Sequence, residues 1–347
     1  MLQVKMYFHL FVNLFISNDG NYHLQNINQK LIVKQDFNII IDNIEQEIIC
    51  ERENLQQLQT IYIAVNCSRD LDFEQWQRIL NILQPLARNI IEYNLELHCN
   101  NTYELFLLWN SYGVNRLIWK VISFSWAVFL QNNYCDNINY VKQINKALVS
   151  GFKNQAIDLF YNLKGSSKAV IENGLNILRK LPVNHISYYE ADNNCVVITY
   201  QWLKNILKQN GYLPYEKNNF ITNRGIKSQH QYSYWTLQNY LGVGMGASSF
   251  HKNSQIVICQ NTNEYPLWRQ TITKITKQEY YGQIFIMGLG LIEGVDLRIK
   301  QNQVAYEYFK NAINKLIVKK KLNIKNNFLF CYQDEWENLD EILLSFI

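Results

Sequence analysis

The residues with the most recognisable chemistry lie in a run that begins at His230 and is rich in aromatic side chains and glycines. His230 is followed by Tyr232, Tyr234 and Trp235, and glycines then stand at positions 242, 244 and 246. An imidazole can coordinate a metal ion, and aromatic rings beside it could form an apolar wall. Glycines two residues apart let the backbone approach another surface closely. The alternative is a loop histidine that bonds the backbone, with aromatic side chains packed onto the domain.

Two carboxylates, Glu96 and Asp158, belong to strand-like runs. At strand ends they could hydrogen-bond the hydroxyl or amino groups of a nucleotide-like ligand. The alternative is that both carboxylates are solvated or paired with a cation. The patterns of other catalytic classes, namely G-x-S-x-G, the P-loop and the dinucleotide fingerprint, do not occur in the sequence.

The cysteines are widely spaced, at positions 50, 67, 99, 135, 195, 259 and 331. No C-x-x-C pair occurs, so neither a zinc ribbon nor a ferredoxin-like cluster is predicted. An odd number of dispersed cysteines is typical of buried free thiols in a reducing compartment. The apolar run 8–16 is short and contains His9 and Asn13, which indicates a strand rather than a signal peptide or membrane span. We therefore expect a cytoplasmic protein.

The composition indicates a packed globular chain. Its 347 residues allow one large domain and a smaller one, and 48% of them are hydrophobic. The net charge of +4 is small and dispersed along the chain. Such a charge argues against a nucleic-acid partner.

Strand-like and helix-like runs alternate through the first two thirds of the chain. Expected strands cover 4–12, 60–65, 90–97, 114–121, 155–161 and 185–189, and expected helices cover 31–53, 73–86, 102–112, 139–150, 168–180 and 197–210. This alternation predicts an α/β fold with parallel strands joined by right-handed crossovers. Asp72 is a suitable N-cap for the second helix. Later helices are expected at 278–291, 303–316 and 338–346, with a short strand at 328–330.

Several motifs resemble those of one family. The run His230-Gln231-Tyr232-Ser233-Tyr234-Trp235, followed by Tyr240-Leu241-Gly242-Val243-Gly244-Met245-Gly246-Ala247, is similar to H-N-x-x-Y-W and Y-x-G-x-G-x-G-A of the HemW family. These are heme chaperones related to oxygen-independent coproporphyrinogen III oxidase, in the radical SAM superfamily. Gly113-Val114-Asn115-Arg116-Leu117 and His185-Ile186-Ser187-Tyr188 resemble two further family motifs. The resemblance implies a partial (βα)6 radical-SAM-type barrel over residues 1–235 and a smaller, mostly helical C-terminal domain over 236–347.

The resemblance also locates the family's cofactor positions in this chain. The three cysteines that hold a 4Fe–4S cluster in the family correspond here to Asn13, Ser17 and Gly20, on the loop expected after the first strand. These side chains supply no thiolate, so the cluster is not expected. Where the family has I-G-V-Q-S-F, this chain has Trp119-Lys120-Val121-Ile122-Ser123-Phe124, and Ile122 replaces the glutamine that bonds S-adenosylmethionine. The positions of that cofactor site that keep the family's residue are Tyr7, Glu96 and Asp158.

From this resemblance we expect a HemW-like heme chaperone homologue that binds heme or a porphyrin without radical SAM catalysis. His230 is the candidate heme ligand, since imidazole is a common axial ligand. The implied partner is an unidentified protein that accepts the heme. Two alternatives remain: a coproporphyrinogen oxidase-like radical SAM enzyme, which would need the 4Fe–4S cluster and S-adenosylmethionine, and a non-catalytic scaffold. No catalytic residue and no metal ligand is predicted.

Overall fold

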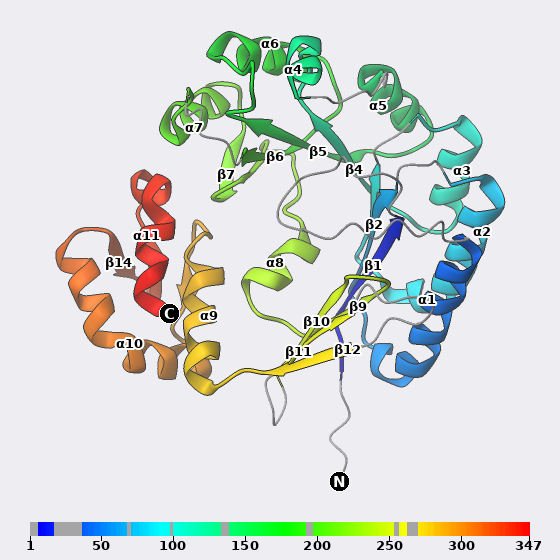
Figure 1. Cartoon of the computed structure of the whole chain (residues 1–347). Coiled ribbons are helices and arrows are strands. Elements are labelled where there is room, and N and C mark those ends of the chain that lie inside the picture. Colours follow the sequence, from blue (N-terminus) through cyan, green and yellow to red (C-terminus); the bar gives the residue numbers. More distant parts are fainter. Residues whose placement is uncertain are drawn as a thin grey trace. The chain divides into compact units, whose positions relative to one another are not determined.

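The computed structural model describes residues 6–16, 37–67, 71–97, 100–132, 139–191, 197–252, 257–261 and 270–347. The chain divides into two compact units, each assembled from segments far apart in sequence (Figure 1). The first unit comprises Met1–Val121, Cys135–Ala156 and Asn239–Thr273; the second comprises Ile122–Tyr134, Ile157–Gln238 and Lys274–Ile347. The domain boundary at residue 235 stays a prediction.

The first unit contains a sheet with the strand order β12-β11-β10-β9-β1-β2-β3-β4. Its strands are β1 (His9–Ile16), β2 (Thr60–Cys67), β3 (Glu92–Leu97), β4 (Arg116–Ile122), β9 (Tyr240–Val243), β10 (Ser248–His251), β11 (Val257–Asn261) and β12 (Gln270–Lys274). Strands β1 to β4 pair in parallel in chain order, and β9 pairs in parallel with β1. The predicted α/β fold with parallel strands is therefore confirmed.

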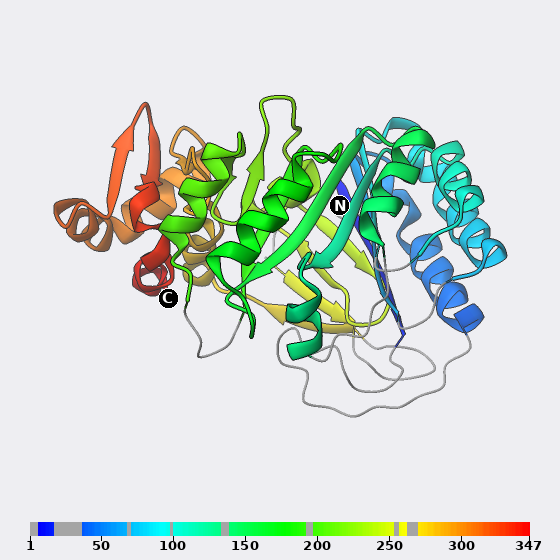
Figure 2. The ribbon, with the colours of Figure 1, turned by 90° about the horizontal axis from the view of Figure 1, so that it is seen from above.

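Helices cover one face of these parallel strands (Figure 2). They are α1 (Phe37–Glu51), α2 (Phe73–Leu83), α3 (Tyr103–Ser111) and α5 (Tyr140–Val149). Helix α2 begins where the sequence predicts, because Asp72 accepts a 2.8 Å hydrogen bond from the backbone N–H of Gln75. The Gln75 side chain bonds back to the Asp72 N–H, which completes a capping box.

Along β1 to β4 the side chains alternate between an apolar face and a polar face. The apolar face includes Trp119, whose ring lies 6.2 Å from that of Phe106 on α3, so this face packs against the helices. The opposite, inner face is also buried, yet it carries polar side chains: His9, Asn13, Thr60, Glu92, Asn94, Glu96 and Arg116. Burying polar groups costs free energy unless they are paired. The inner face is therefore the part of the first unit in which to look for a site.

The second unit contains strands in the order β5-β6-β8-β7, in which β8 is antiparallel to both of its neighbours. They are β5 (Asn154–Tyr161), which begins in the first unit's residues, β6 (His185–Glu190), β7 (Leu213–Glu216) and β8 (Asn219–Ile221). The helices before residue 240 are α4 (Trp126–Gln131), α6 (Lys168–Leu178), α7 (Tyr200–Gln209) and α8 (Gln229–Trp235). The C-terminal segment adds α9 (Lys277–Gly288), β13 (Val295–Asp296), α10 (Lys300–Val318), β14 (Leu322–Lys325), β15 (Phe328–Cys331) and α11 (Leu339–Leu343).

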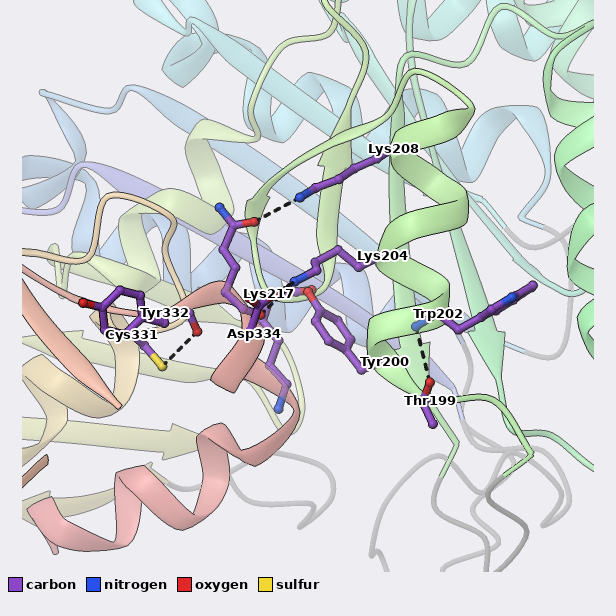
Figure 3. Close-up of polar contacts among 10 residues, drawn as sticks. Thr199, Tyr200, Trp202, Lys204, Lys208, Lys217, Cys331, Tyr332 and Asp334 are labelled. Atoms are coloured by element: carbon purple, nitrogen blue, oxygen red, sulfur yellow. Dashed lines mark hydrogen bonds and ion pairs between the residues drawn. The ribbon is translucent and has the colours of Figure 1, made fainter. Parts of the chain in front are cut away.

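A buried lysine attaches the C-terminal segment to α7 (Figure 3). The Lys204 side chain is 2% exposed, and its ammonium lies 3.0 Å from a carboxylate oxygen of Asp334. The Asp334 side chain, in contrast, is exposed. The same ammonium donates to the backbone carbonyl of Gln333 at 3.0 Å. Hydrogen bonding to Lys204, together with its charge, lowers the pKa of Asp334. This lysine therefore fixes the C-terminal segment to the rest of the second unit.

Two expectations about local structure are wrong. The bounds 4–12 expected for the first strand are wrong in ending at residue 12, because β1 spans His9–Ile16, as the apolar run 8–16 indicated, so Asn13 lies within the strand. The alternative of a loop histidine at His230 is wrong, because the residue lies in α8, which Ser228 caps by accepting from the N–H of Gln231. Helix α4 was not predicted. Among the helices of the described ranges, none is both long enough and apolar enough to cross a membrane.

Candidate functional site

Glu96 is one of the buried polar residues on the inner face of the first unit. It is buried near the end of β3, and its carboxylate accepts a 2.7 Å hydrogen bond from the Tyr62 hydroxyl on β2. The other carboxylate oxygen lies 3.5 Å from the ammonium of Lys120 on β4. Three neighbouring strands therefore bring an acid, a phenol and a cation together. The sequence reasoning missed Lys120 as a partner of Glu96, although a lysine within an apolar strand is itself a signal that a buried carboxylate lies nearby.

Asn13 binds the glycine-rich segment that follows β9. Its side-chain amide donates a 2.8 Å hydrogen bond to the backbone carbonyl of Met245. One residue earlier, the backbone N–H of Gly244 donates to the Glu47 carboxylate of α1 at 2.8 Å. A Cβ atom on Gly244 would stand 2.3 Å from the backbone oxygen of Asn13, and its φ is +94°. Only glycine fits at this close approach of two backbone segments.

The described residues of the family's cluster site do not fit an iron–sulfur cluster. A cluster needs thiolates, and Asn13 supplies a neutral amide whose nitrogen already donates to Met245. Ser17 and Gly20 lie outside the described residues. Within the described ranges, no three His, Cys, Asp or Glu side chains are grouped so as to hold a metal ion.

Two further positions that the resemblance assigns to S-adenosylmethionine, Tyr7 and Asp158, are buried, whereas Ile122 is partly buried. Tyr7 packs edge-on against the His251 ring, with centroids 5.5 Å apart. Asp158 is buried on β5, two residues after Ala156, so the two side chains share one face of that strand. Ile122, in the glutamine position, has a φ of +65°, which is rare for a β-branched residue. Its side chain packs against an apolar cluster of Val128, Leu163 and Ala191, where it can donate no hydrogen bond to a cofactor.

His230 is enclosed within the second unit. Its side chain is 1% exposed, and its Nε2 atom lies 2.8 Å from the Tyr234 hydroxyl one turn later on α8. The two rings meet edge-on with centroids 5.1 Å apart. His185 makes a similar contact, with Nε2 2.7 Å from the Tyr215 hydroxyl. An axial heme bond through His230 Nε2 therefore requires that the Tyr234 hydroxyl move away.

A hydrogen bond and an ion pair to Glu293 hold the aromatic side chains of α8 in place. The Tyr232 hydroxyl donates to the Glu293 carboxylate at 3.2 Å, and the Lys227 ammonium pairs with the same oxygen at 3.2 Å. Burial, followed by the negative charge of Glu293, raises the pKa of Tyr232 to about 12. The phenol is therefore neutral at pH 7 and holds α8 against the segment after α9. Trp235 contacts Tyr215 edge-on, with ring centroids 5.9 Å apart.

Comparisons with known proteins find relatives of similar sequence. The chain is 24% identical over 220 residues to the protein named heme chaperone HemW of Lactococcus lactis subsp. lactis (strain IL1403), a match that spans 56% of this chain and 58% of that protein. It is 23% identical over 309 residues to heme chaperone HemW of Buchnera aphidicola subsp. Acyrthosiphon pisum (strain APS), which spans 80% of this chain and 75% of that one. No protein-family model matches the chain.

One solved structure has a similar fold throughout. Coproporphyrinogen III oxidase (HemN) from Escherichia coli, described as a radical SAM enzyme, superposes with a TM-score of 0.78 at 16% identity, over 99% of this chain and 90% of that one. At this identity the likeness shows the fold alone. The match to the Lactococcus lactis relative covers less than two thirds of that protein's length.

Proposed function

We propose that this chain, which is similar to proteins named heme chaperone HemW and has the fold of HemN, binds heme or a porphyrin as cargo and does so without radical SAM catalysis. The cargo would then pass to an acceptor protein, a role that is consistent with the name heme chaperone of the relatives. The observation that carries the non-catalytic part is the hydrogen bond from Asn13 to the Met245 carbonyl. It gives a structural role to the position at which the family has a cluster cysteine.

The heme-binding part of the proposal rests on α8. The helix places His230 beside Tyr234, within a block of aromatic side chains that could contact a porphyrin face. In the structure the imidazole Nε2 is bonded to the Tyr234 hydroxyl. That hydroxyl would compete with heme iron for the same nitrogen. Tyr234→Phe should therefore strengthen heme binding, whereas His230→Ala should abolish it.

The test is a heme titration of the full chain followed through the Soret band. We expect saturable binding by the wild type, tighter binding by Tyr234→Phe and none by His230→Ala. His185→Gln is the matched control, because His185 is equally buried and also bonded to a tyrosine hydroxyl. Absence of a saturable Soret band in the wild type would refute heme binding. Equal losses in His185→Gln and His230→Ala would remove His230 from the proposal.

A further inference from the structure

On the inner face of the first unit, the Glu96 carboxylate has a partner at each of its two oxygens. Glu96 is the acid that the family resemblance assigns to that cofactor, and it is buried at 5% exposure. One carboxylate oxygen accepts from the Tyr62 hydroxyl at 2.7 Å, and the other faces the Lys120 ammonium at 3.5 Å. Both oxygens of Glu96 therefore already have partners supplied by the protein itself.

Lys120 reaches Glu96 from a position at which the family has no side chain. In the family stretch I-G-V-Q-S-F, the glycine corresponds to Lys120 of this chain. Lys120 lies two residues after Ile118 on β4, so both side chains point to the same face of the strand. Ile118 belongs to an apolar cluster with Tyr62, Ala64 and Ala156 on this inner face. A four-carbon chain with an ammonium group thus enters the space that a glycine leaves open.

We propose that Lys120 closes the S-adenosylmethionine subsite from within, converting Glu96 from a cofactor ligand into one half of a structural ion pair. This inference rests on the proposed non-catalytic function and adds a residue and a mechanism to it. A buried carboxylate without a partner is strongly destabilising, so Glu96 needs a cation when no ligand is bound. Lys120 supplies that cation permanently. A ligand hydroxyl would have to displace the ammonium before it could reach the carboxylate.

The first arm of the test is a double-mutant cycle on the full chain. Lys120→Met should raise the unfolding equilibrium constant at least about tenfold, because it leaves Glu96 buried without its cation. In a Glu96→Gln background the same change should raise that constant less than about threefold. Glu307 and Lys310 form the matched control pair. Their charged groups lie 3.0 Å apart, but the side chains are exposed, at 58% for Glu307 and 50% for Lys310. Their coupling should be close to zero.

The second arm is calorimetric titration with S-adenosylmethionine. The wild type should show no saturable binding up to about 1 mM ligand. Saturable binding by the wild type would overturn the inference, and so would a coupling no larger than that of the control pair. If Lys120→Met does not fold, Lys120→Arg, which keeps the positive charge, should fold with wild-type stability. If neither variant folds, Lys120 has a role in packing, and the inference is overturned.

The two proposals fail separately. A wild-type chain that binds heme and also S-adenosylmethionine would overturn the closed subsite and leave the heme proposal standing. A chain that binds neither would leave the closed subsite standing and refute heme binding.

Discussion

Replacing Asn13 with alanine tests the structural role given to this residue. The change removes the hydrogen bond from the Asn13 amide to the Met245 carbonyl. A hydrogen bond contributes about 0.5–1.5 kcal/mol net, but leaving a buried acceptor without a donor raises the cost to about 1–3 kcal/mol. Both residues are buried, so we expect a loss of about 1–3 kcal/mol in the free energy of unfolding. Asn13→Cys should lose a similar amount and gain no cluster.

Two measurements decide the outcome for Asn13. Urea denaturation gives the free energy of unfolding, and amide hydrogen exchange should become faster at residues 244–247, where the bond is lost. Asn145→Ala is the matched control, because the Asn145 amide also donates to a backbone carbonyl, at 2.9 Å, but on an exposed helix surface. A loss below about 0.5 kcal/mol with unchanged exchange at 244–247 would refute the reasoning.

Three further predictions concern other parts of the chain. Lys204→Met should lower the free energy of unfolding of the second unit by about 1.5–3 kcal/mol in urea denaturation, because it removes two hydrogen bonds made by a buried ammonium. Lys208→Met is the control: its ammonium makes one exposed contact of 3.4 Å, so the change should be less than about 0.5 kcal/mol. Burial raises the pKa of Glu216 above its ordinary value of 4.5. The contribution of this group to the free energy of unfolding is therefore fully present below pH 4.5 and is lost as the pH rises through the folded-state pKa. Glu216→Gln should reduce this dependence of the free energy of unfolding on pH, as measured by denaturation at several pH values. Gly244→Ala should lower the free energy of unfolding by clearly more than Gly211→Ala, for which a loss of roughly 1 kcal/mol is expected. Both glycines have a positive φ, but of the two only Gly244 has a backbone atom where a Cβ would stand. Equal losses in thermal unfolding would contradict the close approach of Asn13 and Gly244.

Much of the fold could be predicted because local signals agree with the final packing. The strand at 60–65 and the helix after Asp72 are examples, since an apolar run and a capping box each specify one structure. The apolar run 8–16 indicated a strand that includes Asn13, but the bounds expected for that strand ended too early, at residue 12. Asn13 lies on the inner face of β1, where a buried partner satisfies its amide. Sequence patterns do not show that a polar residue has a partner more than two hundred positions away.

The candidate site was less predictable for the same reason. The motifs identified Glu96 and His230, but their environments depend on residues that are distant in sequence or on an unexpected helix. Lys120 lies on the next strand from Glu96, and only the parallel register brings the two together. A loop histidine was the alternative to a ligand at His230. The Ser228 cap instead starts a short helix, and that helix directs the imidazole toward Tyr234.

Anaerobic reconstitution with iron and sulfide, followed by counting both elements per chain, tests the central claim most directly. The claim is that this chain cannot assemble a cluster, because the position that corresponds to the first cluster cysteine of the HemW family is occupied by Asn13, whose amide donates a hydrogen bond to the backbone. The prediction is iron and sulfide far below one cluster per chain, with no absorption band that is lost on reduction. About four irons and four sulfides bound to each purified chain would contradict it.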